Sequence, residues 1–304
     1  MLYRMGSLSS REKRYTNYMI EGRSLSEDWY QNMRKKTLVL WDLQSIHLPW
    51  KAAHENYDAL KSYIQGHKKD LTVASEIHLV SDKAQDAMMK LAQLVTNCVV
   101  SFTTFLTITE QYMARKYKDS QSQLDKWNLT RNALHKKSFS YRLGYELRNY
   151  SQHYGIPLSE IVFTMNPDSI KELQIYVKSE ELLRGGYNWK RLKKELEYKK
   201  NKEIELTTLL FKYLDCIDKI YKNTLLSHYE ELNDCQEFLT ELIKKHEITL
   251  EEYPVVFKGP TPLNCQVPRE KEFIPLYLLN KMNKEWSIKL DFKITSALNG
   301  TKNS

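Results

Sequence analysis

The scarcity of helix-breaking residues constrains the fold of this chain more than any other sequence feature. Its 304 residues include 9 glycines and 8 prolines, and no proline occurs between Pro49 and Pro157. Proline inside a helix removes a hydrogen bond and clashes with the preceding turn, so its absence over this stretch allows long helices. With 41% hydrophobic residues the chain can also bury a substantial core. We therefore expect a mainly α fold.

One uncharged stretch in this region raises the choice between a buried helix and a membrane span. No residue from Leu91 to Thr109 is charged, and the stretch is long enough to cross a bilayer. Its large apolar residues recur at steps of three and four, and threonine, serine, asparagine and glutamine interrupt them. This spacing indicates a buried amphipathic helix. We expect a core helix within a longer helical pattern over 84–117, and no membrane contact.

The next helical pattern starts near Leu124, is interrupted around 135–138 and resumes at Phe139. Gly155 followed by Pro157 ends it, because glycine just past a helix and proline shortly after form a strong stop signal. A polar Ser-Gln-Ser-Gln linker at 120–123 separates this pattern from the preceding helix.

Three regions follow from these patterns. Residues 1–70 are expected to form an N-terminal helical extension of short pieces, with a break near Pro49. Residues 71–247 form a helical domain that contains a short strand pair near 160–178, because two apolar runs flank a turn there. Residues 248–304 contain crowded prolines, so we expect an irregular segment with one short helix around 273–283.

Charge and cysteine usage favour a cytoplasmic protein with an anionic partner. The formal charge of +8 suits nucleic acid, although many soluble proteins carry such a charge for solubility alone. Cys98, Cys216, Cys235 and Cys265 lie far apart without zinc-site spacing, so we expect reduced thiols, no metal and no cofactor. The first residues lack the apolar core of a signal peptide.

Six consecutive residues at the end of the helix before Gly155 carry the strongest chemical signal. They are Arg148-Asn149-Tyr150-Ser151-Gln152-His153. Asn149 and His153 are four positions apart and share a helix face, whereas Arg148 lies about 140° around the helix from His153. Arg148 must therefore reach around the helix, or two copies of the helix must meet across a two-fold axis and share one cleft.

These side chains match the needs of RNA cleavage by transesterification. Histidine can take a proton from the 2′-hydroxyl or donate one to the leaving 5′-oxygen. Arginine stays charged and matches phosphate oxygens with its forked donors. Asparagine can orient the imidazole or contact the phosphate. The alternative interpretation is a surface arginine together with a histidine that closes the last helical turn.

The motif resembles the signature of HEPN domains (higher eukaryotes and prokaryotes nucleotide-binding). An arginine is followed directly by asparagine, and a histidine comes after four intervening residues. The surrounding Phe139-Ser-Tyr-Arg-Leu and Leu147-Arg-Asn-Tyr-Ser-Gln-His-Tyr-Gly-Ile-Pro is similar to uncharacterised bacterial HEPN-like proteins. The resemblance covers roughly residues 85–160.

The resemblance implies an HEPN-like helical bundle, commonly a homodimer, that cleaves RNA without a metal in phage defence or toxin–antitoxin systems. Arg148 and His153 would be catalytic and Asn149 supporting, with Glu146 as a further polar candidate. An antitoxin or defence-complex protein is a candidate partner beside RNA. Some HEPN proteins only bind nucleotides or partners, so a non-catalytic helical RNA- or protein-binding module is the alternative, and a scaffold with no nucleic-acid role is a third.

Basic residues outside the motif are candidates for contacting RNA. They are His135, Lys136, Lys137, Lys190, Arg191 and Lys194. Glutamates interrupt the second group, so a solvated helix face is the competing interpretation. The first group lies at the interruption around 135–138, where a solvent-exposed bend explains it equally well.

Overall fold

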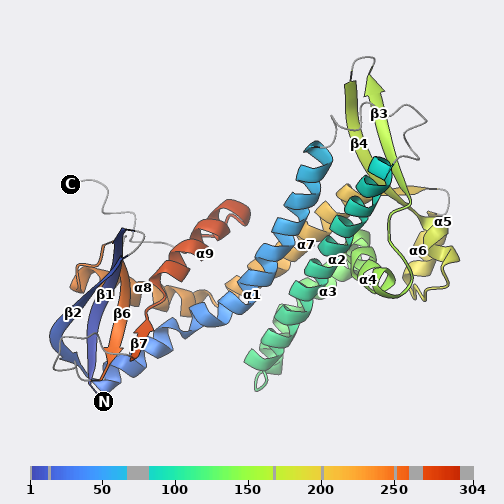
Figure 1. Cartoon of the computed structure of the whole chain (residues 1–304). Coiled ribbons are helices and arrows are strands. Elements are labelled where there is room, and N and C mark those ends of the chain that lie inside the picture. Colours follow the sequence, from blue (N-terminus) through green and yellow to red (C-terminus); the bar gives the residue numbers. More distant parts are fainter. Residues whose placement is uncertain are drawn as a thin grey trace. The chain divides into compact units, whose positions relative to one another are not determined.

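The computed structural model describes residues 2–12, 15–66, 82–166, 169–199, 202–249, 252–259 and 270–294 (Figure 1). The helices are α1 (Glu27–Gly66), α2 (Asp82–Lys116), α3 (Gln121–Lys137), α4 (Phe139–His153), α5 (Ser179–Arg184), α6 (Leu192–Tyr198), α7 (Leu206–Leu226), α8 (Tyr229–Lys245) and α9 (Leu276–Lys289). The strands are β1 (Tyr3–Glu12), β2 (Tyr15–Leu25), β3 (Glu160–Asn166), β4 (Ser169–Lys178), β5 (Glu203–Glu205), β6 (Glu252–Lys258) and β7 (Glu270–Phe273). Helices predominate in the described part, so the expected mainly α fold is confirmed.

The chain divides into two compact units. Met1–His47 and Leu225–Ser304 form the first unit, and Leu48–Thr224 form the second. The two ends of the chain therefore belong to one unit, which differs from the boundaries at residues 70 and 247 that the sequence suggested.

The first unit contains a four-stranded antiparallel sheet in the order β2-β1-β6-β7 (Figure 1). Leu8, Val255 and Phe257 form a buried cluster, against which Ile20 packs. The expected helical start of the N-terminal extension is wrong, because residues 3–12 and 15–25 form the antiparallel strands β1 and β2. One strand that pairs with β1 is β6, from the far end of the chain. The hydrophobic periodicity near the N-terminus therefore gives little indication of the sheet.

The C-terminal segment is also more regular than expected. β6 and β7 supply half of the sheet, and α9 is longer than the short helix expected around 273–283. Val255, Val256 and Phe257 are fully buried, so this apolar run forms a strand despite the prolines around it. Pro254 lies near the start of β6, and its carbonyl accepts a hydrogen bond from the Ile274 amide at 2.9 Å. The prolines at 260, 262 and 268 lie outside the described residues.

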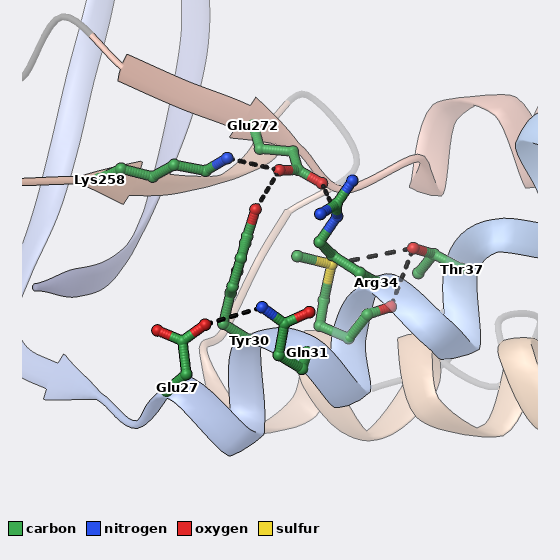
Figure 2. A network of polar contacts seen from close by, with 8 residues as sticks. Glu27, Tyr30, Gln31, Arg34, Thr37, Lys258 and Glu272 are labelled. Atoms are coloured by element: carbon green, nitrogen blue, oxygen red, sulfur yellow. Dashed lines mark hydrogen bonds and ion pairs between the residues drawn. The ribbon is translucent and has the colours of Figure 1, made fainter. Parts of the chain in front are cut away.

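A polar network joins the start of α1 to β6 and β7 (Figure 2). The Glu272 carboxylate accepts hydrogen bonds from Lys258 Nζ at 2.8 Å and from the Tyr30 hydroxyl at 2.5 Å. Arg34 Nε lies 3.3 Å from its other oxygen. Burial alone would raise the pKa of Glu272, but the hydrogen bonds from Lys258 and Tyr30 outweigh burial and lower it. The network therefore holds an ionised carboxylate between three donors.

We expect Glu272→Ala to reduce the free energy of unfolding by about 1–3 kcal/mol, because the Tyr30 hydroxyl and Lys258 ammonium lose their acceptor. The lowered pKa of Glu272 means that its contribution is present above about pH 4.5, the ordinary value, and is lost as the pH falls through the folded-state pKa. Urea denaturation at neutral and at acidic pH measures both effects. Glu270→Ala, exposed on the same strand, is the control; an equal loss in both variants at neutral pH would contradict the assignment.

In the second unit, α1 continues through Pro49, so the expected break there is wrong. Ile46, Trp50 and Ala53 are fully buried on either side of the proline. Packing of these side chains outweighs the one hydrogen bond that proline removes.

α2 is the core helix that the uncharged stretch predicted. Residues 85–116 are long and apolar enough to cross a membrane, but 56% of their most apolar window is buried inside the protein. Thr103 and Thr107 hydroxyls donate to backbone carbonyls one turn earlier, at 2.9 and 3.0 Å. The hydroxyls of Thr103 and Thr107 are thus satisfied within the helix, while Phe102 and Phe105 are fully buried.

The predicted strand pair is confirmed as β3 and β4, and β5 extends it to a three-stranded antiparallel sheet. Leu173, Ile175 and Val177 alternate along β4 and are buried, so one face of the sheet joins the core. The turn residues 167–168 lie outside the described residues.

α4 carries the six-residue motif, and its ends lie where the sequence placed them. The Ser138 side chain accepts a hydrogen bond from the Tyr141 amide at 3.1 Å and caps the first turn. The helix ends at His153, two residues before Gly155. The motif therefore occupies the last turns of a helix with defined ends.

Candidate functional site

Arg148 and Asn149 lie side by side near the end of α4. Arg148 Nη1 donates a hydrogen bond to Asn149 Oδ1 at 2.9 Å. Both side chains are half-buried, and His153 is exposed one turn further on. The contact holds the Arg148 guanidinium against Asn149, on the helix face that Asn149 shares with His153. The Arg148 side chain therefore reaches part of the way around the helix toward His153 within one chain. No hydrogen bond joins Arg148 to His153, two residues that the structure describes.

Asn149 belongs to a chain of hydrogen bonds that ends on Glu146. Its side chain lies within reach of the Tyr187 hydroxyl, and that hydroxyl donates a hydrogen bond to Glu146 Oε2. Lys190 Nζ lies 3.5 Å from the other oxygen of Glu146. Burial and the hydrogen bond to Glu146 raise the pKa of Tyr187 to about 12, so the hydroxyl stays protonated at neutral pH. The chain therefore connects the Arg148 cation to the Glu146 carboxylate through two neutral groups.

Tyr187 was not among the residues expected from the sequence. It lies between α5 and α6, directly after Gly185 and Gly186. Gly186 has a φ of +72°, a conformation that other residues rarely adopt, and it turns the chain back. The sequence signal that could have indicated Tyr187 is the glycine pair followed by Tyr187 and Trp189. Nothing near this segment in the sequence, however, relates Tyr187 to α4, the helix that it contacts.

Tyr187 also belongs to an aromatic cluster around the end of α4. Its ring centre lies 4.7 Å from that of Trp189 and 5.1 Å from that of Tyr154. Tyr150 stacks on Trp189 at 5.3 Å and on Tyr154 at 6.1 Å. Trp189 is 2% exposed and Tyr150 8%, whereas Tyr154 is 52% exposed. The cluster anchors the segment after α5 to α4 and leaves one aromatic ring at the surface.

The structure brings some of the basic candidates close to Glu146. Burial lowers the pKa of His135, and the positive charges of Arg142, Arg131 and Arg191 lower it further, while Glu146 acts in the opposite direction. These charges act on His135 because they lie nearby. Of the basic candidates, Lys190 contacts the carboxylate to which Tyr187 donates, and His135 lies within electrostatic reach of that carboxylate.

Arg142 fixes this corner of the unit. Its Nε and Nη2 donate to the two oxygens of Glu195 at 3.1 and 2.7 Å. Its Nη1 donates to the backbone carbonyls of His135 and Lys136 at 2.6 and 2.7 Å. The same arginine thus joins the end of α3, α4 and α6. The side chains of Lys136, Lys137 and Lys194 are exposed.

A cavity of about 250 Å³ lies beside this corner, between α2, α3 and α4. Its lining residues are Leu106, Thr107, Glu110, Arg131, Asn132, His135, Tyr141 and Tyr145. Glu110 and Arg131 form an ion pair there. His135 is shared between this cavity and the surroundings of Glu146, and Tyr145 lies one turn before Arg148 on α4.

The described residues hold no group of three or more histidine, cysteine or acidic side chains placed to bind a metal ion. Cys98, Cys216 and Cys235 are buried free thiols. Burial raises the pKa of Cys98 to about 12 and, as the main cause, also that of Cys235 to about 12. They are therefore protonated at neutral pH, and Cys265 lies outside the described residues.

No family model matches the chain, and no curated protein or solved structure matches it.

Proposed function

We propose that the protein is a metal-independent endoribonuclease of HEPN type that acts in phage defence or as a toxin. The observation that carries the proposal is the arrangement at the end of α4. Arg148 is held beside Asn149 by a 2.9 Å hydrogen bond, and His153 is exposed on the face that Asn149 shares. In this proposal, Arg148 is the phosphate-binding cation and His153 the proton carrier, about one and a half turns apart on the same helix.

In the proposed reaction the 2′-hydroxyl of a ribose attacks the adjacent phosphorus, and the P–O5′ bond breaks. His153 transfers protons to or from the reacting oxygens. Arg148 stabilises the charge that develops on the phosphate oxygens. The products are a 2′,3′-cyclic phosphate and a free 5′-hydroxyl. Lys190 and Arg191 add cationic groups for contact with the RNA backbone, whereas the lowered pKa of His135 favours its neutral form, which can only donate or accept a hydrogen bond there.

A homodimer suits this arrangement because no direct contact joins Arg148 to His153 within one chain. Two copies of α4 that met across a two-fold axis would each complete the other's site. An antitoxin or a defence-complex protein remains a further proposed partner, and the proposed location is cytoplasmic.

Incubation of the purified protein with RNA in excess EDTA tests the activity. We expect cleavage to persist, with 2′,3′-cyclic phosphate ends detected by their resistance to a phosphatase that lacks cyclic phosphodiesterase activity. No cleavage in either EDTA or a divalent cation would overturn the proposal. Tight, salt-sensitive RNA binding without cleavage would instead support the second candidate, a non-catalytic helical binding module, which the missing Arg148–His153 contact favours.

Tyr187→Phe should lower kcat for RNA cleavage at least about tenfold and leave KM nearly unchanged. The variant keeps the aromatic contacts but removes the hydroxyl that links Asn149 to Glu146, and one such hydrogen bond is worth about 1.5–3 kcal/mol when a charged group takes part. Tyr187 is thus a positioning residue, which steady-state kinetics on a short RNA would show. Tyr198→Phe, at a ring that is 82% exposed, is the control. An unchanged kcat in Tyr187→Phe would show that the hydrogen-bond chain does not position Asn149.

A further inference from the structure

Tyr154 presents an aromatic ring to solvent directly beside the motif. It follows His153 in the chain and closes the last turn of α4, where its amide donates to the Tyr150 carbonyl at 2.8 Å. The side chain is 52% exposed, unlike the two buried members of the cluster behind it. Exposure of this ring costs apolar burial.

The ring is held in one orientation from two sides. Tyr150 lies almost parallel to it, with an interplanar angle of 11° at 6.1 Å, and Tyr187 meets it edge-on at 5.1 Å. Trp189 fixes both of these partners, and its indole nitrogen donates to the Leu182 carbonyl at 2.9 Å. A ring held in this way needs little ordering before a flat ligand stacks on it.

The segment that contacts the ring through Tyr187 carries two exposed cations, Lys190 and Arg191, and Lys190 pairs with the Glu146 carboxylate. Tyr187, which contacts Tyr154, donates to Glu146, and Lys190 lies beside that same carboxylate with 67% of its side chain exposed. Arg191 follows Lys190 and is exposed. Proteins bind single strands with exposed aromatic rings and nearby cations, because bases stack on the ring while cations contact phosphates. Bases inside a duplex already stack on each other and offer no free face.

We propose that Tyr154 stacks an unpaired nucleobase next to the phosphate that is cleaved, which makes single-stranded RNA the substrate class of this site. The inference rests on the proposed ribonuclease function for the identity of the ligand. It assigns a role to a residue outside the motif. It also predicts a preference for single-stranded over double-stranded RNA, which the chemistry of the motif does not require.

The test measures binding without cleavage. Short 2′-O-methyl RNA has no nucleophilic hydroxyl and is inert to the proposed reaction, so fluorescence anisotropy can compare a labelled single strand with its duplex. Tyr154→Ala should weaken single-strand binding about 5- to 150-fold and leave duplex binding unchanged. Tyr154→Phe and Tyr154→Trp keep the aromatic face and should bind like the wild type. Tyr154→Leu keeps an apolar side chain over the cluster, and it should lose affinity as alanine does.

Tyr198→Ala removes another exposed tyrosine of the same unit and is the matched control. Thermal unfolding of each variant shows whether a loss of affinity comes from a loss of folded protein. If Tyr154→Ala is destabilised, Tyr154→Leu is compared with the wild type instead. Wild-type binding by both Tyr154→Ala and Tyr154→Leu, or an equal loss for single strand and duplex, would overturn the inference. The protein could bind single strands selectively through Tyr154 and still fail to cleave ordinary RNA. That result would support the stacking site and contradict the ribonuclease proposal.

Discussion

Arg148→Ala and His153→Ala should each reduce the rate of RNA cleavage at least about 100-fold. The first variant removes the forked cation that stabilises phosphate charge, and the second removes the proton carrier. Neither side chain is fully buried, so both variants should stay folded. Single-turnover cleavage of a single-stranded RNA in EDTA measures the rate, and circular dichroism confirms the fold. Arg148→Lys, which keeps the charge but not the fork, should recover only part of the lost activity.

Gln152→Ala is the matched control for both variants, because Gln152 is an exposed motif residue that the proposed chemistry does not use. It should cleave at nearly the wild-type rate. If Arg148→Ala and His153→Ala cleave as fast as Gln152→Ala, the assignment of both catalytic residues is wrong, whatever the source of the activity.

A mixture of the two inactive variants distinguishes one chain from two. If each site takes its arginine from one copy and its histidine from the other, a mixed dimer holds one intact site. Random exchange of subunits would then restore about a quarter of the wild-type activity, because about half of the dimers are mixed and each has one site of two. An inactive mixture would assign both residues of a site to the same chain.

Local signals were sufficient for the helix that carries the motif. Ser138 caps its start and Gly155 follows its end, and both act through backbone geometry within a few residues. The apolar spacing of α2 and the alternation of Leu173, Ile175 and Val177 in β4 are local in the same sense. Elements of this kind can be predicted from the sequence, because the physical cause lies within the segment itself.

Two features depend on segments that are distant in the chain, and the sequence did not predict them. β1 pairs with β6, where Tyr3 lies opposite Lys258, and no periodicity near residue 3 encodes that partner. Tyr187 completes the hydrogen-bond chain of Asn149 and Glu146 only because the fold returns the segment after α5 to α4. The catalytic candidates could be named from their spacing, whereas Tyr187, which contacts Glu146 on the same helix, needed the tertiary structure.

Gly144→Ala should lower the free energy of unfolding by about 1–3 kcal/mol, although alanine favours helices more than glycine does. A Cβ atom at this position of α4 would lie 2.2 Å from Cδ1 of Tyr213. That ring is fully buried, and its edge-on contacts with Phe102 at 5.3 Å and Tyr141 at 5.5 Å leave it little room to shift. Urea denaturation measures the loss.

A loss of stability on Gly144→Ala would indicate the close approach of α4 to Tyr213, because glycine-to-alanine changes in helices usually increase stability. An exposed helical glycine replaced by alanine gains about 1 kcal/mol, and Gly66→Ala, at the end of α1 where a Cβ meets no atom within 4 Å, should be neutral or stabilising. Tyr213→Leu removes the ring that the new methyl group of Gly144→Ala would strike. Gly144→Ala should therefore cost less free energy of unfolding in the Tyr213→Leu variant than in the wild type. Additive losses would mean that α4 does not approach Tyr213 so closely. Because the motif begins one turn after Gly144, the displacement that relieves the clash should also lower RNA cleavage at temperatures where the variant is still folded.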